Sequence, residues 1–167
     1  MKPVLRFLLQ LVLYAPLMLL IGSFSSRPPF RVIGDDQALL RVSFTHAAQR
    51  KLACRERGAA ELAKLAPNMR AALDCPRERA SMLLEVELDG ALILRRTLPP
   101  TGFQKDGAVT LSHRLPVAAG RHRLVSRLRD RGDGDFNYIS ERTLDLAPGA
   151  MLIVDFSAER GGFVFRG

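Results

Sequence analysis

The chain has 167 residues and a formal net charge of +8, and 47% of its residues are hydrophobic and 25% charged. This length suits one domain of ordinary size, and this composition excludes a wholly disordered chain. Two basic residues and no acidic residue precede residue 27, so the remaining 23 basic and 17 acidic residues give that part a net charge of +6. The basic residues are scattered, which favours a solvated surface near anionic headgroups over nucleic-acid binding.

The N-terminal segment predicts a transmembrane helix. From Phe7 to Ile21 its only strongly polar residue is Gln10. With its apolar flanks the segment reaches the roughly 20 residues that a helix needs to cross a bilayer. Lys2 and Arg6 precede it, which predicts a cytoplasmic N-terminus and an external C-terminal part. The alternative is a cleaved signal peptide with Ser23-Phe24-Ser25 as its cleavage site.

Further along, the sequence divides into segments of different character. Two prolines after the apolar segment disfavour helix and predict a short, stiff spacer. The expected organisation is an anchor at 1–25, a linker at 26–38 and an outer domain at 39–167 with a helical insertion at 49–75. Within the insertion, Ala59–Leu65 has high helix propensity and Pro67 ends it.

The outer domain has the alternating pattern of β-strands. Leu40–Thr45 places Leu40, Val42 and Phe44 on one face, and Leu84–Leu88 alternates in the same way. Asp89-Gly90 predicts a two-residue hairpin turn into the next strand. Further strands are expected at 91–96, 109–115, 121–129, 136–146, 151–156 and 163–165, with a turn at Pro116–Gly120. Such short strands with frequent turns predict a mainly β, immunoglobulin-like sandwich, which the last strand either completes or extends to a partner.

Two stretches resemble known classes of protein. Leu88-Asp89-Gly90 and Pro116-Val117-Ala118-Ala119-Gly120-Arg121-His122-Arg123-Leu124 resemble PEGA-type and other immunoglobulin-like bacterial envelope domains, in which a Gly-x-His-x-Leu loop begins a strand. That resemblance implies a fold and little about a role. Cys54, Asn68-Met69-Arg70 and Cys75-Pro76-Arg77-Glu78-Arg79 resemble uncharacterised single-pass proteobacterial membrane proteins associated with respiratory enzymes. The second resemblance implies a membrane complex as partner.

The two cysteines predict a disulfide. In an oxidising compartment Cys54 and Cys75 would pair, and closing the loop between them would stabilise the fold by about 3 kcal/mol in the chain-entropy model. The alternative is a thiol pair that binds copper or exchanges disulfides. The Cys-x-x-Cys spacing typical of redox pairs is absent from the sequence.

The remaining polar residues give weaker signals. His113 and His122 flank one turn and are expected to face each other across a hairpin, where they would bind copper if they bind a metal; otherwise they are ordinary strand histidines. Asp130–Asn137 clusters carboxylates and glycines, which indicates either a calcium loop or, more simply, a tight turn.

The function that these patterns favour is not enzymatic. The sequence contains none of the common hydrolase, phosphate-binding or zinc-protease motifs, and no cofactor is expected. We expect a single-pass accessory subunit in a bacterial inner membrane with a periplasmic C-terminal domain, in contact with lipid and an inner-membrane complex (a respiratory one if the second resemblance holds), but not with nucleic acid. The alternatives are a periplasmic copper-handling protein and an envelope module that binds glycan or lipid. The residues expected to dock on the partner are Tyr14, Pro16, Met69, Arg70, Arg77 and Arg79.

Overall fold

The computed structural model describes residues 3–26 and 33–167, which form two units, Met1–Gly34 and Asp35–Gly167. The first unit contains one helix, α1 (Pro3–Ser26), which runs through Pro16 without a break. Its Pro3–Ser25 segment is long and apolar enough to cross a membrane, as predicted, and signal sequences share this property. Residues 27–32 of the predicted linker lie outside the described residues.

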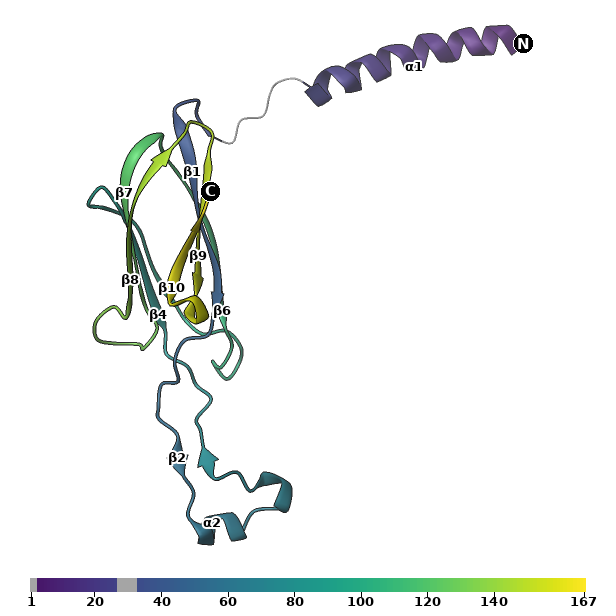
Figure 1. Ribbon diagram of the computed structural model, residues 1–167. Coiled ribbons are helices and arrows are strands. Elements are labelled where there is room, and N and C mark those ends of the chain that lie inside the picture. The colour runs from purple at the N-terminus through teal and green to yellow at the C-terminus, as the bar shows by residue number, and fades with distance from the viewer. Residues whose placement is uncertain (1–2, 27–32) are drawn as a thin grey trace. The chain divides into compact units, whose positions relative to one another are not determined.

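The second unit contains two four-stranded sheets, which together we call the β-domain (Figure 1). The first sheet has the order β10-β9-β1-β6, and the second has the order β5-β4-β7-β8. All neighbours are antiparallel except β1 and β9, which are parallel. The strands are β1 (Gln37–His46), β4 (Met82–Leu88), β5 (Ala91–Leu98), β6 (Val109–Ala118), β7 (Gly120–Arg129), β8 (Tyr138–Leu146), β9 (Met151–Ser157) and β10 (Gly162–Arg166), with a short 3₁₀ helix, η2 (Ala158–Arg160), between the last two.

One apolar core lies between the two sheets. In β1 every second side chain is buried, as the alternation predicted, and Leu40, Val42 and Phe44 are all at most 4% exposed. The second sheet contributes an equally buried set to the same cluster: Met82, Leu84, Val86, Leu124 and Leu128. Burial of both sets removes apolar area from water, which is the main force that holds the sheets together. The prediction of a mainly β domain after an apolar helix is therefore confirmed.

The predicted hairpin at Asp89-Gly90 is confirmed. Both residues have positive φ, 53° for Asp89 and 84° for Gly90, as the tight turn between β4 and β5 requires. The predicted turn at Pro116–Gly120 is partly wrong, because β6 continues through Pro116, which pairs with Leu39. Since β6 is an edge strand, a proline without an N–H group can be accommodated there.

The last strand completes the core. β10 pairs with β9 at the edge of the first sheet, and Phe163 and Phe165 pack against the buried cluster. Phe163 also meets the ring of Phe156 edge-on at 5.4 Å, and the Phe156 ring contacts Tyr138 and His46 as well. Core completion by the C-terminal strand, the favoured prediction, is confirmed.

Candidate functional site: the disulfide-bridged arm

Between β1 and β4 the chain forms an extension, residues 49–80, which we call the arm (Figure 1). The arm leaves and re-enters the β-domain as two antiparallel segments. At its root the amide of Lys51 donates to the carbonyl of Glu78 at 3.0 Å, and the amide of Ala80 donates to Gln49 at 2.9 Å. The side chains of Lys51 and Glu78 also form an ion pair at 3.3 Å. The root is therefore a regular, hydrogen-bonded base.

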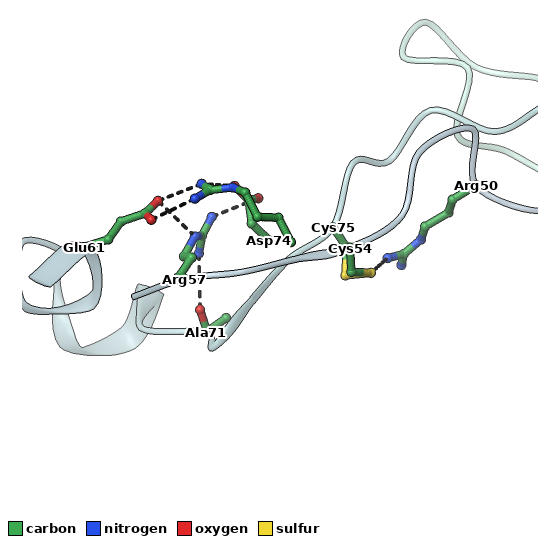
Figure 2. A network of polar contacts seen from close by, with 8 residues as sticks. Arg50, Cys54, Arg57, Glu61, Ala71, Asp74 and Cys75 are labelled. Carbon is green, nitrogen blue, oxygen red and sulfur yellow. Dashed lines mark hydrogen bonds and ion pairs between the residues drawn. A yellow bond between two sulfur atoms is a disulfide. The ribbon is translucent and has the colours of Figure 1, made fainter. Parts of the chain in front are cut away.

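A disulfide closes the arm beyond its root (Figure 2). Cys54 and Cys75 are bonded, which confirms the predicted pairing, and they are 21 residues apart in sequence. A bridge over such a loop contributes about 3 kcal/mol by restricting the unfolded chain. Because disulfides persist where thiols are oxidised, the bond also indicates an oxidising compartment.

Beyond the disulfide, an ion-pair network holds the arm together (Figure 2). Arg55 donates to both carboxylate oxygens of Glu61, at 3.0 and 2.8 Å, and also to Asp74 at 3.2 Å. Arg57 pairs with Asp74 at 3.0 Å and donates to the carbonyl of Ala71. The hydrogen bond from Arg55 lowers the pKa of Glu61, so the carboxylate stays charged. Arginine forks of this kind fix geometry as well as charge.

The arm has almost no apolar interior. Its elements are β2 (Arg55–Glu56), α2 (Ala59–Ala63), η1 (Pro67–Met69) and β3 (Leu73–Asp74), and neither helix contains a buried residue. The predicted helix is thus shorter than expected, because no core is present to extend it. Leu52, Met69 and Leu73 are 64%, 62% and 53% exposed. The disulfide and the polar network fix a surface that presents large apolar side chains to the surroundings.

The arm also presents positive charge. Among the described residues, four of its exposed bases have no ion-pair partner: Arg50, Lys64, Arg70 and Arg77. Arg50 donates to the sulfur of Cys54, and Arg70 donates to the carbonyl of Leu65 at 3.0 Å, so both have neutral hydrogen-bond acceptors. An exposed surface of this composition favours an acidic or anionic counterpart.

The predicted docking residues fall in different places. Met69, Arg70 and Arg77 are exposed on the arm. Arg79 is half-buried, and its guanidinium donates to the carbonyls of Asp106 at 2.8 Å and Ala48 at 2.6 Å. Its side chain therefore fastens the root of the arm to the β-domain. Tyr14 and Pro16 belong to α1, in the other unit.

Sequence reasoning missed a basic pocket beside the root of the arm. A pocket of about 480 Å³ lies there, with more basic than acidic side chains in its wall: Lys51, Arg79, Lys105 and Arg131 against Glu78 and Asp133. Phe103, in the adjoining loop, is fully exposed. Lys105 has φ 52°, and its carbonyl accepts from the amide of Arg79. The run of proline and glycine residues at 99–107 predicted a loop, but it did not predict that this loop lies beside the root of the arm.

The two histidines do not form the expected hairpin. β6, which carries His113, and β7, which carries His122, belong to different sheets. His122 instead contacts the Asp89 carboxylate and the Ala118 carbonyl. In the part of the chain that the structure describes, no group of three or more His, Cys, Asp or Glu side chains is placed to hold a metal ion. A metal-binding role for His113 and His122 stays a prediction.

The acidic loop after β7 contains a buried polar cluster. Asp130 is 2% exposed, and its carboxylate contacts Nε2 of His46 at 2.9 Å and the Nδ2 of Asn137 at 2.8 Å. Its backbone amide donates to Oδ1 of Asn137 at 3.1 Å, and its carbonyl accepts from the amide of Gln49 at the root of the arm. Asp130 therefore ties the loop to β1 and the arm.

No family model, no curated protein and no solved structure matches the chain.

Proposed function

We propose that this chain is a membrane-anchored interaction subunit that docks on an inner-membrane protein complex through its arm. The observation that carries the proposal is the construction of the arm. A disulfide and a network of arginine forks hold a segment without a core, and this segment exposes Met69 and Leu73 beside unpaired bases. Apolar anchors within a charged rim are what protein interfaces use.

The anchor supports a partner in the same membrane. The apolar α1 is a candidate membrane span, and Lys2 and Arg6 at its start favour a cytoplasmic N-terminus. The β-domain would then lie on the periplasmic side of a bacterial inner membrane, where the disulfide is stable. About ten residues join Ser26 to Gln37, and a chain of that length spans at most about 35 Å. Such a tether keeps the domain beside proteins that share its membrane.

The partner that fits the arm has a defined chemistry. It presents an acidic rim for Arg70 and Arg77 and an apolar depression for Met69. A respiratory complex is the partner that we favour. The β-domain, which we assign to the immunoglobulin-like class, serves as a rigid support for the arm. The proposal requires no catalysis, no cofactor and no nucleic acid.

The test is recovery of the tagged full-length chain from membranes in mild detergent, with the bound proteins quantified. We expect a membrane complex in stoichiometric amount with the wild-type chain. The double variant Met69→Asp, Arg70→Glu should retain at least about tenfold less of it, since interface anchors each contribute roughly 1–2 kcal/mol.

The matched control carries the same chemical changes at the far end of the β-domain. Leu92 and Arg121 are both exposed there, and the variant Leu92→Asp, Arg121→Glu should retain the complex like wild type. Recovery of wild type without another protein in stoichiometric amount would refute the proposal. Equal losses in the two double variants would show that charge alone, and not the arm, governs retention.

A further inference from the structure

One face of α1 carries two polar side chains, Gln10 and Tyr14, within the apolar stretch from Phe7 to Ile21. Gln10 and Tyr14 lie one turn apart on the same side of α1. Together with Phe7, Leu11, Ala15 and Met18 they line a shallow groove of about 360 Å³ along the helix. Both polar side chains are therefore on one continuous strip, and the rest of the helix surface between Phe7 and Ile21 is hydrocarbon apart from Pro16.

Gln10 and Tyr14 both lie at the depth of the hydrocarbon core when α1 crosses a bilayer. Residue 14 is the middle of the Pro3–Ser25 span, so the Tyr14 backbone lies at the centre of the bilayer when α1 crosses it. Gln10 is four residues away, which at 1.5 Å per residue is about 6 Å from the centre. The hydrocarbon core extends roughly 15 Å to either side of the centre. Both side chains thus belong to the region without water.

A carboxamide or hydroxyl in hydrocarbon is costly unless another group bonds to it. Within the described residues neither Gln10 nor Tyr14 has a side-chain hydrogen bond. An interaction partner in the membrane would supply what lipid cannot. The groove is the place where that partner fits.

We propose that α1 pairs in parallel with α1 of a second copy of this chain, through the Gln10–Tyr14 face. The inference rests on the retained anchor of the proposed function. Two copies inserted in the same direction place their Gln10 side chains at one depth and their Tyr14 side chains at another. An amide and a hydroxyl each both donate and accept, so each is complementary to its own copy. Symmetry supplies this match, whereas an unrelated helix would need polar groups at both depths.

The spacing along the groove fits such a pair. Phe7, Leu11, Tyr14 and Met18 follow one another at intervals of four, three and four residues, which is the seam of a left-handed helix pair. Pro16 is nine residues, or two and a half turns, from Phe7 and so lies on the opposite face. A bend at Pro16 leaves the seam intact, and the face that bears it stays open for helices of the partner complex.

Cysteine cross-linking in membranes tests the pairing directly. Leu11 lies on the proposed seam, and Leu9 lies on the opposite face at nearly the same depth. In the full-length chain, Leu11→Cys should form a reductant-sensitive dimer of twice the chain mass on oxidation with copper phenanthroline. Leu9→Cys should form none, and the wild-type chain controls for exchange with the Cys54–Cys75 disulfide.

A second measurement examines the polar groups. Energy transfer between labelled full-length chains in lipid vesicles gives the association constant of the dimer. Gln10→Leu should weaken association about three- to thirtyfold, the range expected for one interhelical hydrogen bond in a membrane. Gln10→Asn keeps an amide and should recover part of the loss. Leu20→Ala, on the face away from the seam, should leave association unchanged.

The outcomes separate this inference from the proposed function. Equal cross-linking of the two cysteine variants, a Leu11→Cys adduct with another protein, or wild-type association of Gln10→Leu would each overturn the pairing alone. Intact mass of the same membrane sample reports whether α1 is retained. A mature chain that lacks residues 1–25 would overturn both the pairing and the anchored subunit.

Discussion

Nδ1 of His122, in β7, lies 2.6 Å from Oδ2 of Asp89, in the turn that joins β4 to β5. Nε2 of the same ring lies 3.0 Å from the carbonyl of Ala118. Because a carbonyl only accepts, Nε2 carries a hydrogen, and the carboxylate draws a second hydrogen to Nδ1. This geometry favours the doubly protonated, cationic form of the imidazole. The hydrogen bond to Asp89 raises the pKa of His122, and the same bond lowers the pKa of Asp89.

This pair predicts that stability depends on pH. The raised pKa of His122 gives stability that is complete below the ordinary value of 6.5 and is lost as the pH rises through the folded value. The lowered pKa of Asp89 gives stability that is complete above 3.8 and is lost as the pH falls through its folded value. Urea unfolding of the full-length chain should therefore show a midpoint that falls as the pH is raised from 6 to 9.

Asp89→Asn is the control for this prediction. Asparagine also tolerates positive φ before glycine, and its carbonyl oxygen can still accept from the amide of Arg123, which lies 2.8 Å from Oδ1 in the wild type. The turn is preserved and only the charge is removed. The fall between pH 6 and 9 should then be smaller in the variant. Parallel pH profiles for the two proteins would show that His122 is not responsible.

The buried carboxylate of Asp130 should be necessary for stability. Asp130→Ala leaves His46 and Asn137 without their acceptor in a site closed to water. The free energy of unfolding should fall by about 2–4 kcal/mol, which is the usual cost of breaking a buried polar cluster. Asp133→Ala changes an exposed residue of the same loop and should alter the value by less than about 0.5 kcal/mol. Urea titration measures both, and similar losses would contradict the assignment.

The aromatic ring of Phe156 should be equally important for the core. Its edge-on contacts reach four rings, those of Phe44, His46, Tyr138 and Phe163. Phe156→Ala should destabilise the β-domain by about 3–5 kcal/mol, because a cavity remains where the ring was. Phe103→Ala removes the same side chain from a fully exposed position and should have almost no effect. Thermal or urea unfolding of both variants gives the comparison.

Reduction of the disulfide should loosen the arm and leave the β-domain intact. The Arg57 amide donates to Ala72 across the arm at 2.8 Å, and its hydrogen exchange reports local opening. Loss of about 3 kcal/mol of loop-closure stabilisation corresponds to roughly hundredfold faster exchange at this amide. The Cys54→Ser, Cys75→Ser double variant should behave like the reduced protein. A matching fall in the urea midpoint of the β-domain would show instead that arm and sheets unfold together.

The sequence predicted those parts of the fold that depend on neighbours along the chain. Alternation fixed the buried face of β1, and Asp89-Gly90 predicted its turn because both residue types tolerate positive φ. The turn predicted to begin at Pro116 was wrong because a strand tolerates proline where the side that would use its N–H group has no neighbouring strand. Which side of a strand is paired cannot be read from adjacent residues. The helix expected in the insertion is limited to Ala59–Ala63, because helix length also depends on packing and none of its residues is buried.

The candidate site was predicted less completely. The disulfide could be predicted because the chain has two cysteines. The ion pairs of Arg55 and the hydrogen bonds of Arg79 could not, because they depend on three-dimensional proximity. His46 and Asp130 are 84 residues apart in sequence, and no spacing rule connects them. The prediction that His113 and His122 face each other across a hairpin was wrong because the chain passes from one sheet to the other after Ala118. The residues of the turn do not encode this crossover.

The parallel pairing of β1 with β9 determines the order in which the chain can fold. Leu40 pairs with Leu115 on one side and with Leu152 on the other, so the first strand of the β-domain receives its second neighbour only after β9 has been synthesised. Contacts this distant in sequence form slowly, and until they form β1 has an open edge that attracts other strands. A ribosome that stops before β9 would therefore release a chain that aggregates or is degraded.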